Sequence, residues 1–93
     1  MTSCWILQAQ VSGKVQGVSY RAWTRAQAQA LELKGWVRNL SDGRVELWAT
    51  GPRPQLEQLL LACHRGPPAA QVEAVQAEWR EGEEDYAVFE ILY

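Results

Sequence analysis

The sequence holds few of the residues that build metal sites and disulfide frameworks. Its 93 residues include two cysteines, Cys4 and Cys63, and a single histidine, His64. A zinc site made of cysteine and histidine needs four ligands, so the chain has too few of them. We expect both cysteines to be reduced thiols in the core, because cysteine packs like a small apolar residue, and His64 to lie at the surface. A disulfide between the two cysteines stays an open alternative.

Long apolar runs are missing as well. The longest, Leu59–Cys63, is far shorter than the ~20 residues that span a bilayer. The N-terminal segment Met1–Trp5 has neither the basic region nor the apolar stretch of a secretory signal. We therefore expect a cytoplasmic protein with no membrane partner.

Length and composition are those of one globular domain, residues 1–93. Hydrophobic residues make up 47% and charged residues 22%, which argues against a disordered chain. The charges are uneven: residues 1–45 carry six basic side chains and two acidic ones, whereas residues 46–93 carry three and nine. An anionic ligand is therefore expected in the first half. Nucleic-acid binding usually needs a basic domain and is disfavoured.

Apolar spacing predicts a β-α-β-β-α-β order. Period-two alternation marks strand segments, and apolar residues at helical spacing mark two helices. The hydroxyl of Ser19 is expected to cap the first helix, Gly43 to form the turn of a hairpin, and Gly66 to end the second helix. The expected strands are residues 5–11, 36–40, 44–50, 72–79 and 86–93, and the expected helices are residues 20–33 and 56–63.

This order is that of the ferredoxin-like α+β sandwich, an antiparallel sheet with two helices on one face. Residues 86–93 are expected either as the fourth strand of the sheet or as an added edge strand beside residues 72–79. Because this fold supports many unrelated functions, the function must be sought in a site.

One glycine-rich segment carries the clearest chemical signal. Between the first strand and the first helix lies Gly13-Lys14-Val15-Gln16-Gly17-Val18-Ser19-Tyr20-Arg21. Backbone N–H groups in such a loop can converge on an anion at the positive end of the helix dipole. That dipole disfavours Arg21 in the first helical turn unless an anion lies beside it. From spacing alone, a plain turn with a solvated arginine is the alternative.

Asn39 is a second candidate. It lies at the end of a predicted strand, where its amide could hold a water molecule, although a turn-capping role fits its position equally well. Other phosphate motifs are absent, since the chain has neither G-x-x-x-x-G-K-[ST] nor G-x-G-x-x-G. Few carboxylates lie near the loop in sequence, so no metal is implied, and the acidic run Glu81–Asp85 is expected to be a solvated loop.

Three blocks of the sequence resemble the signature of the acylphosphatase family. They are Gly13-Lys14-Val15-Gln16-Gly17-Val18-x-Tyr20-Arg21, Gly35-Trp36-Val37-Arg38-Asn39 and Asp42-Gly43-x-Val45-Glu46. They occur in the family's order and spacing, and the resemblance covers essentially the whole chain. The chain departs from the family at Tyr20, where phenylalanine is usual, and at Glu32, where glycine is frequent; neither departure removes a reacting group.

The resemblance implies hydrolysis of the carboxyl–phosphate bond of acyl phosphates, without a metal or cofactor. Arg21 matches the family's phosphate-binding arginine, and Asn39 matches the residue that positions the attacking water. A carboxylate leaving group has a conjugate acid with a pKa near ~4, so it departs without a general acid such as His64. The implied phosphate-binding residues are Val15, Gln16, Gly17, Val18, Ser19, Tyr20 and Arg21, with added positive potential from Lys14 and Arg38.

Two other functions would fit parts of the sequence. An RNA-recognition domain shares the element order, but residues 44–50 lack its aromatic motif. A small-anion sensor could use the same glycine-rich loop to bind its ligand, although a sensor would not need the water-positioning amide of Asn39. The expected partners are an acyl phosphate and inorganic phosphate, bound by a monomer, and either Trp23 or Trp36 could border the acyl group.

Overall fold

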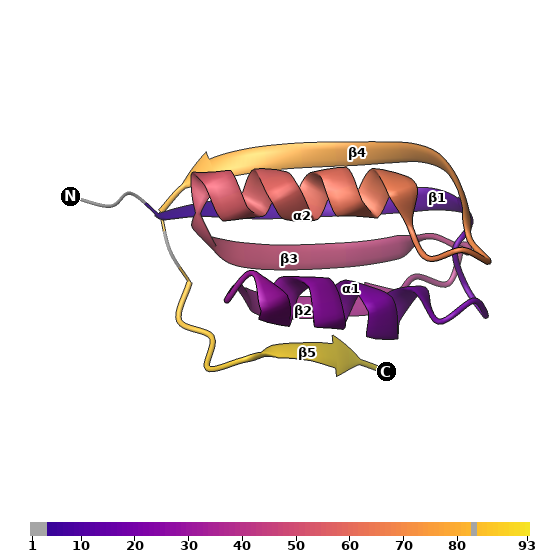
Figure 1. Cartoon of the computed structure of the whole chain (residues 1–93), viewed down its shortest axis with the longest axis horizontal. Coiled ribbons are helices and arrows are strands. Elements are labelled where there is room, and N and C mark those ends of the chain that lie inside the picture. The colour runs from indigo at the N-terminus through magenta and orange to yellow at the C-terminus, as the bar shows by residue number, and fades with distance from the viewer. Residues whose placement is uncertain (1–3, 83) are drawn as a thin grey trace.

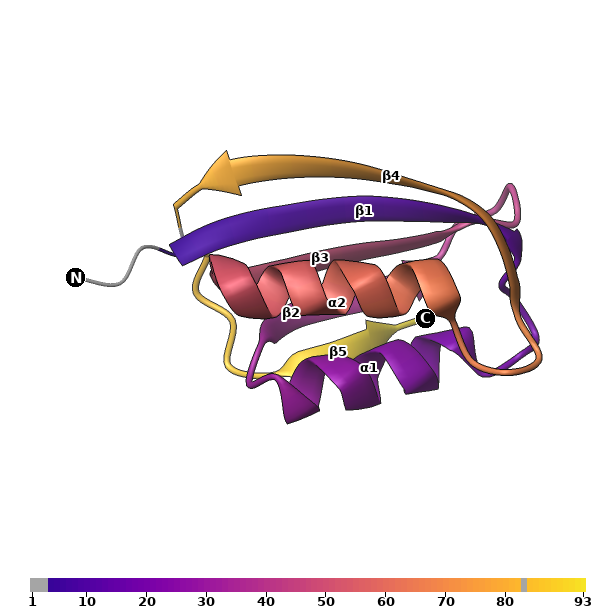
Figure 2. The same cartoon turned by 45° about the horizontal axis from the view of Figure 1, so that its top comes forward.

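A five-stranded sheet with two helices on one face forms the fold in the computed structural model, which describes residues 4–82 and 84–93 (Figures 1 and 2). Met1–Ser3, part of the segment compared with a secretory signal, and Glu83, part of the expected charged loop, lie outside the described residues. None of the described helices is long and apolar enough to cross a membrane. The elements are β1 (Cys4–Lys14), α1 (Tyr20–Ala30), β2 (Lys34–Asn39), β3 (Val45–Pro52), α2 (Arg53–Arg65), β4 (Gln71–Glu81) and β5 (Phe89–Leu92).

The strands lie in the order β4-β1-β3-β2-β5. β1 pairs antiparallel with β3 and β4, and β2 pairs antiparallel with β3, so the predicted ferredoxin-like fold is confirmed. β5 pairs with β2 in parallel, with Phe89 opposite Gly35, which makes the sheet mixed rather than purely antiparallel.

The last strand corrects a second expectation. It is an added edge strand, but it lies beside β2 and not beside residues 72–79, which form most of β4 at the opposite edge. The physical reason is the position of α1, which packs over β2 and β5. In this position Phe89 is buried and Ile91 packs against the core.

The core lies between the sheet and the helices, as the alternation predicts. Every second residue along β1 and β3 faces the helices and is buried. α1 is shorter than predicted, because Glu32 adopts a left-handed conformation (φ 58°) that ends the helix. The main buried side chains are Leu7, Ala9, Val11, Tyr20, Thr24, Ala28, Val45, Leu47, Ala49, Leu56, Leu59 and Cys63.

Ser19 precedes α1 as predicted, but its hydroxyl makes no capping hydrogen bond, so that prediction is wrong. The residue adopts a left-handed conformation (φ 63°, ψ 25°), whereas a capping side chain needs extended backbone to reach the N–H groups of the first turn. The start of α1 is therefore left without a side-chain cap.

Candidate active site

A cavity of about 310 Å³ lies at the start of α1. It forms where the loop after β1, the end of β2 and the C-terminal end of β5 meet, at the right-hand end of the sheet in Figure 1. The structure thereby brings together Arg21 and Asn39, which come from different elements. The lining residues are Val15, Gly17, Ser19, Tyr20, Arg21, Ala22, Asn39, Ile91 and Tyr93.

Arg21 supplies the positive charge of this cavity. It lies half-buried in the first turn of α1, which contains no acidic residue. Its Nη1 donates a long hydrogen bond of 3.5 Å to the carbonyl oxygen of Leu92, and its guanidinium lies 4.9 Å from the centre of the Tyr93 ring. Within residues 4–82 and 84–93, no carboxylate forms an ion pair with Arg21. Its charge is thus available to an anion.

The loop contributes backbone N–H groups. Those of residues 15–19 donate no hydrogen bond to any described part of the chain. Gly17 (φ 74°) and Ser19 (φ 63°) both have left-handed backbone, and such bends turn successive N–H groups toward a common point. The uncapped N-terminus of α1 lies next to them and adds the positive end of its dipole. Loop and helix together therefore present a concavity whose free N–H groups and positive potential suit an anion.

Asn39 lies at the end of β2, on the face of the sheet that carries the helices. It follows Val37 by two residues, and Val37 is buried on that face. Its Oδ1 is buried and has no hydrogen-bond partner in the described structure. A buried amide oxygen without a partner costs about 1–3 kcal/mol. A polar guest in the cavity would recover this free energy.

The loop residues divide into two groups. Val15, Gly17, Ser19 and Tyr20 line the cavity, whereas Gln16 and Val18 do not. The Gln16 side chain turns instead to the β2–β3 turn, where its Nε2 donates to two carbonyl oxygens.

Comparisons with known proteins point to one family. The family model for acylphosphatases matches residues 7–91. The chain belongs to the acylphosphatase family. An acylphosphatase from Acaryochloris marina is 54% identical over 86 residues, which cover 92% of this chain and 91% of that protein. One from Chloroflexus aurantiacus is 49% identical over 83 residues, 89% of this chain and 90% of that protein. The crystal structure of an acylphosphatase from Bacillus subtilis matches with a TM-score of 0.93 at 34% identity, over 96% of this chain and 99% of that one.

Within this family member, the C-terminal segment supplies site residues that sequence reasoning missed. Ile91 and Tyr93 line the cavity, and the carbonyl oxygen of Leu92 accepts the hydrogen bond from Arg21. The alternation of Phe89, Ile91 and Tyr93 was a visible signal that these residues share a face. Nothing in the sequence showed that this face meets α1 rather than β4.

Neither tryptophan proposed to border the acyl group lines the cavity. Trp36 lies on the other face of the sheet and stacks on Trp48, with ring centres 6.1 Å apart and planes at 16°. Trp23 lies one turn into α1, with its ring 5.9 Å from that of Tyr20. The apolar lining of the cavity comes instead from Val15 of the loop, Ala22 of α1 and Ile91 of the C-terminal segment.

Arg38 does not add positive potential to the site as expected. It lies on the far face of the sheet, where Nε and Nη2 donate to Glu46 Oε1 at 3.0 and 2.8 Å. Burial raises the pKa of the Glu46 carboxyl, but the hydrogen bonds from Arg38 and Gln10 outweigh burial and hold that pKa below its ordinary value. The alternation of side chains along a strand could have predicted that Arg38 faces away from the helices, because Val37 precedes it and is buried on the helix side. Lys14 is exposed at the end of β1.

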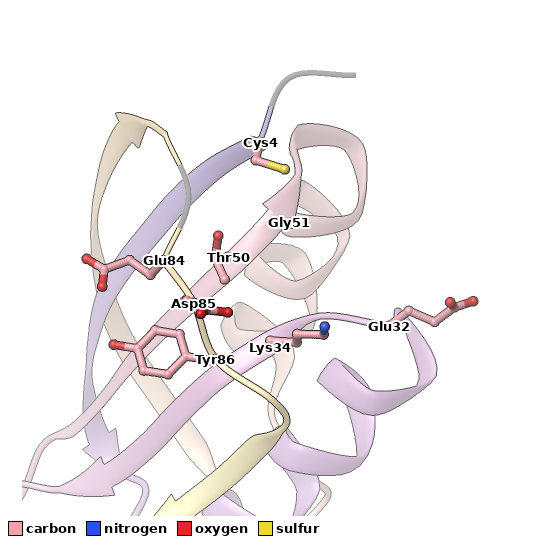
Figure 3. A pocket seen from close by; sticks show the side chains of 8 residues that line it. All are labelled: Cys4, Glu32, Lys34, Thr50, Gly51, Glu84, Asp85 and Tyr86. Atoms are coloured by element: carbon pink, nitrogen blue, oxygen red, sulfur yellow. The ribbon is translucent and has the colours of Figure 1, made fainter. Parts of the chain in front are cut away.

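A larger cavity of about 630 Å³ opens at the other end of β2 (Figure 3). Its lining includes one basic residue, Lys34, and three acidic residues, Glu32, Glu84 and Asp85. A phosphate dianion would be repelled by three negative charges for one positive charge. The smaller cavity with Arg21 is therefore the candidate active site.

The remaining sequence candidates lie away from that site. His64 is exposed in the last turn of α2, as expected. Cys63 is a buried thiol and not half of a disulfide, and burial raises the pKa of this thiol to about 12. It is therefore protonated at neutral pH and is not a nucleophile.

Proposed function

We propose that the cavity at the start of α1 hydrolyses the carboxyl–phosphate bond of acyl phosphates, without a metal ion, to a carboxylate and inorganic phosphate. Membership of the family gives the class of enzyme, and the roles of individual residues are our proposal. The observation that carries it is the convergence on one cavity of an arginine without an acidic partner, unused loop N–H groups and a buried amide oxygen.

Arg21 and the loop would bind the phosphoryl group. A guanidinium can donate two parallel hydrogen bonds to two phosphoryl oxygens, and the N–H groups of residues 15–19 can approach the same group from the other side. Phosphoryl transfer depends mainly on position and charge stabilisation rather than on covalent chemistry by the protein. Donors held in advance around the phosphoryl oxygens supply that stabilisation.

Asn39 would hold the attacking water. Its Oδ1 accepts a hydrogen bond from this water, which leaves a lone pair of the water oxygen directed at phosphorus. As the new P–O bond forms, the bond from phosphorus to the acyl oxygen breaks and its electron pair leaves with the carboxylate. The proton lost by the water passes to a phosphoryl oxygen. No general acid is required, because a carboxylate is a weak base (conjugate-acid pKa near ~4).

We further propose that this enzyme is a cytoplasmic monomer, a single domain over residues 1–93, with no cofactor and no nucleic-acid or membrane partner. Residues 4–82 and 84–93 contain no cluster of three His, Cys, Asp or Glu side chains that could hold an ion, and the comparison of turnover with and without EDTA tests the metal-free reaction directly. Size-exclusion chromatography with light scattering would test the monomer, and a dimer mass would refute it.

The decisive experiment follows the ultraviolet loss of benzoyl phosphate by the purified protein, with and without EDTA. We expect turnover that EDTA does not reduce. Arg21→Ala should lower kcat/KM by about 10³-fold, as arginines acting on transferred phosphoryl groups do. Arg25→Ala is the matched control, because Arg25 is exposed one turn further along α1 and does not line the cavity.

The outcomes separate enzyme from sensor. A loss below tenfold in Arg21→Ala, or an equal loss in Arg25→Ala, would refute the role of Arg21. A well-folded wild-type protein without turnover would refute hydrolysis, and phosphate titration would then test a small-anion sensor.

A further inference from the structure

The side chain of Gln16 joins the two halves of the candidate site. Gln16 is half-buried in the loop, and its Nε2 donates to the carbonyl oxygen of Leu40 at 2.8 Å and to that of Arg44 at 3.0 Å. The same two carbonyls close the β2–β3 turn, since Leu40 N donates to Arg44 O at 2.8 Å and Gly43 N donates to Leu40 O at 3.2 Å. Gln16 therefore binds to a turn that its own backbone hydrogen bonds already stabilise.

The hydrogen bonds of Gln16 connect the two parts of the candidate site. Gln16 lies within the loop whose N–H groups face the anion, and Leu40 directly follows Asn39. In the described structure, the hydrogen bonds of Gln16 are the only ones between residues 15–19 and residues 39–44. Loop and turn lie at the same end of the sheet (Figure 2). The Gln16 carboxamide is thus the hydrogen-bonded link between the phosphate-binding loop and the turn that follows Asn39.

We propose that Gln16 is a positioning residue for the hydrolysis: its carboxamide holds the phosphate-binding loop in register with Asn39, so that the bound phosphoryl group lies in line with the water. This inference rests on the proposed function. The side chain of Gln16 touches neither substrate nor water, because it turns away from the cavity toward the β2–β3 turn.

The chemistry of the contact requires an amide. One nitrogen carries the two hydrogens that two carbonyl oxygens accept. Methionine has a similar length and no donor, so Gln16→Met removes both hydrogen bonds and keeps the side-chain volume. Glutamate at this position would direct oxygens at two carbonyl oxygens and push the loop away from the turn.

The test separates alignment from binding. A misplacement of about 1 Å costs about 10²-fold in rate, so Gln16→Met should lower kcat by about 10- to 100-fold. KM, and the affinity for inorganic phosphate measured by calorimetry, should change by less than about threefold, because Arg21 and the loop N–H groups remain. Gln58→Met, on the exposed face of α2, is the matched control and should leave both unchanged.

A double-mutant cycle on kcat gives the sharper readout. In an Asn39→Ala background, Gln16→Met should cost less than about threefold, because no positioned water remains to be misaligned. Equal costs in both backgrounds, or a loss of phosphate affinity as large as the loss of kcat, would overturn the positioning role in an active enzyme. A folded wild-type protein without turnover would overturn the proposed function itself, and the role of Gln16 with it.

Discussion

At the scale of the residue, the candidate site depends on polar side chains that lack an ion-pair or hydrogen-bond partner within the described structure. Arg21 has no acidic partner in the described structure, and Asn39 buries an amide oxygen that accepts no hydrogen bond. When a polar anion and its water bind, the buried amide oxygen gains a hydrogen-bond donor and the guanidinium gains a counter-charge. Polar groups held in this way are already oriented for the transition state, which is where enzymes gain most of their rate.

Asn39→Ala should lower kcat by about 10²- to 10⁴-fold and change KM little, because the water loses its acceptor while the phosphoryl group keeps Arg21 and the loop. Steady-state kinetics on benzoyl phosphate measures this. Ser41→Ala is the control, since Ser41 is exposed in the adjacent turn. Unchanged turnover in Asn39→Ala would mean that Asn39 is a turn residue only.

Glu32 has a left-handed backbone. Its φ of 58° is a conformation that a side chain disfavours and glycine adopts freely. Relief of the left-handed conformation is worth about 1–2 kcal/mol and exceeds the entropy that glycine adds to the unfolded chain, about 0.4–1 kcal/mol, so Glu32→Gly should raise the free energy of unfolding by about 0.5–1 kcal/mol, measured by urea denaturation. Glu32→Ala removes the charge but keeps the strain, so it should give no gain. Equal stabilisation by both variants would assign the effect to charge instead.

At the scale of the element, a buried hydrogen bond holds the two helices together. The Tyr20 hydroxyl, at the start of α1, donates to the carbonyl oxygen of Cys63 in the last turn of α2 at 2.7 Å. That carbonyl is one of the last four of α2, which have no N–H partner within the helix. Burial, and then the neighbouring Cys63, raise the pKa of the Tyr20 phenol well above its ordinary value, so it remains a donor at all working pH values. The Tyr20 phenol therefore fills the core and also links α1 to α2 by a hydrogen bond.

Tyr20→Phe should lower the free energy of unfolding by about 1–2 kcal/mol, because the Cys63 carbonyl stays buried and loses its donor. Thermal and urea denaturation measure this. Tyr86→Phe removes the same atom from a phenol that forms no hydrogen bond with the described residues, so it should have almost no effect. A loss of the same size in Tyr86→Phe would contradict the role of the buried bond.

At the scale of the whole molecule, the position of β5 completes the site. The parallel pairing with β2 carries the C-terminal segment alongside α1, where Ile91 and Tyr93 form a wall and Tyr93 lies against Arg21. An edge strand beside β4 would have left this side of the cavity open. The site thus depends on both ends of the described sequence.

Tyr93→Ala should lower kcat/KM by about two- to fivefold without changing the melting temperature. An exposed cation–π contact is worth about 0.5–1 kcal/mol, and Tyr93 is 99% exposed, so its loss should loosen Arg21 without affecting the core. Val88→Ala, exposed in the same segment, is the control. An unchanged kcat/KM in Tyr93→Ala would show that the contact does not orient Arg21.

Local structure and family membership follow from the amino-acid sequence without knowledge of distant contacts. Alternation along residues 5–11 and 44–50 decided which side chains would face the helices, because side chains of a strand point to opposite faces in turn. The glycine-rich segment and its two companion blocks identified the family. These conclusions needed only neighbours along the chain and residue types.

Tertiary structure decided what depends on distant partners. The place of β5 follows from the space beneath α1, the left-handed Ser19 from the path of the loop, and the role of Gln16 from two carbonyls on another element. The hydrogen bond from Gln16 to Leu40 joins residues 24 positions apart, and the local preferences of neither segment predict it. Such contacts form only when burial brings the elements together, which is why the sequence named Arg21 and Asn39 but not the residues that hold them in register.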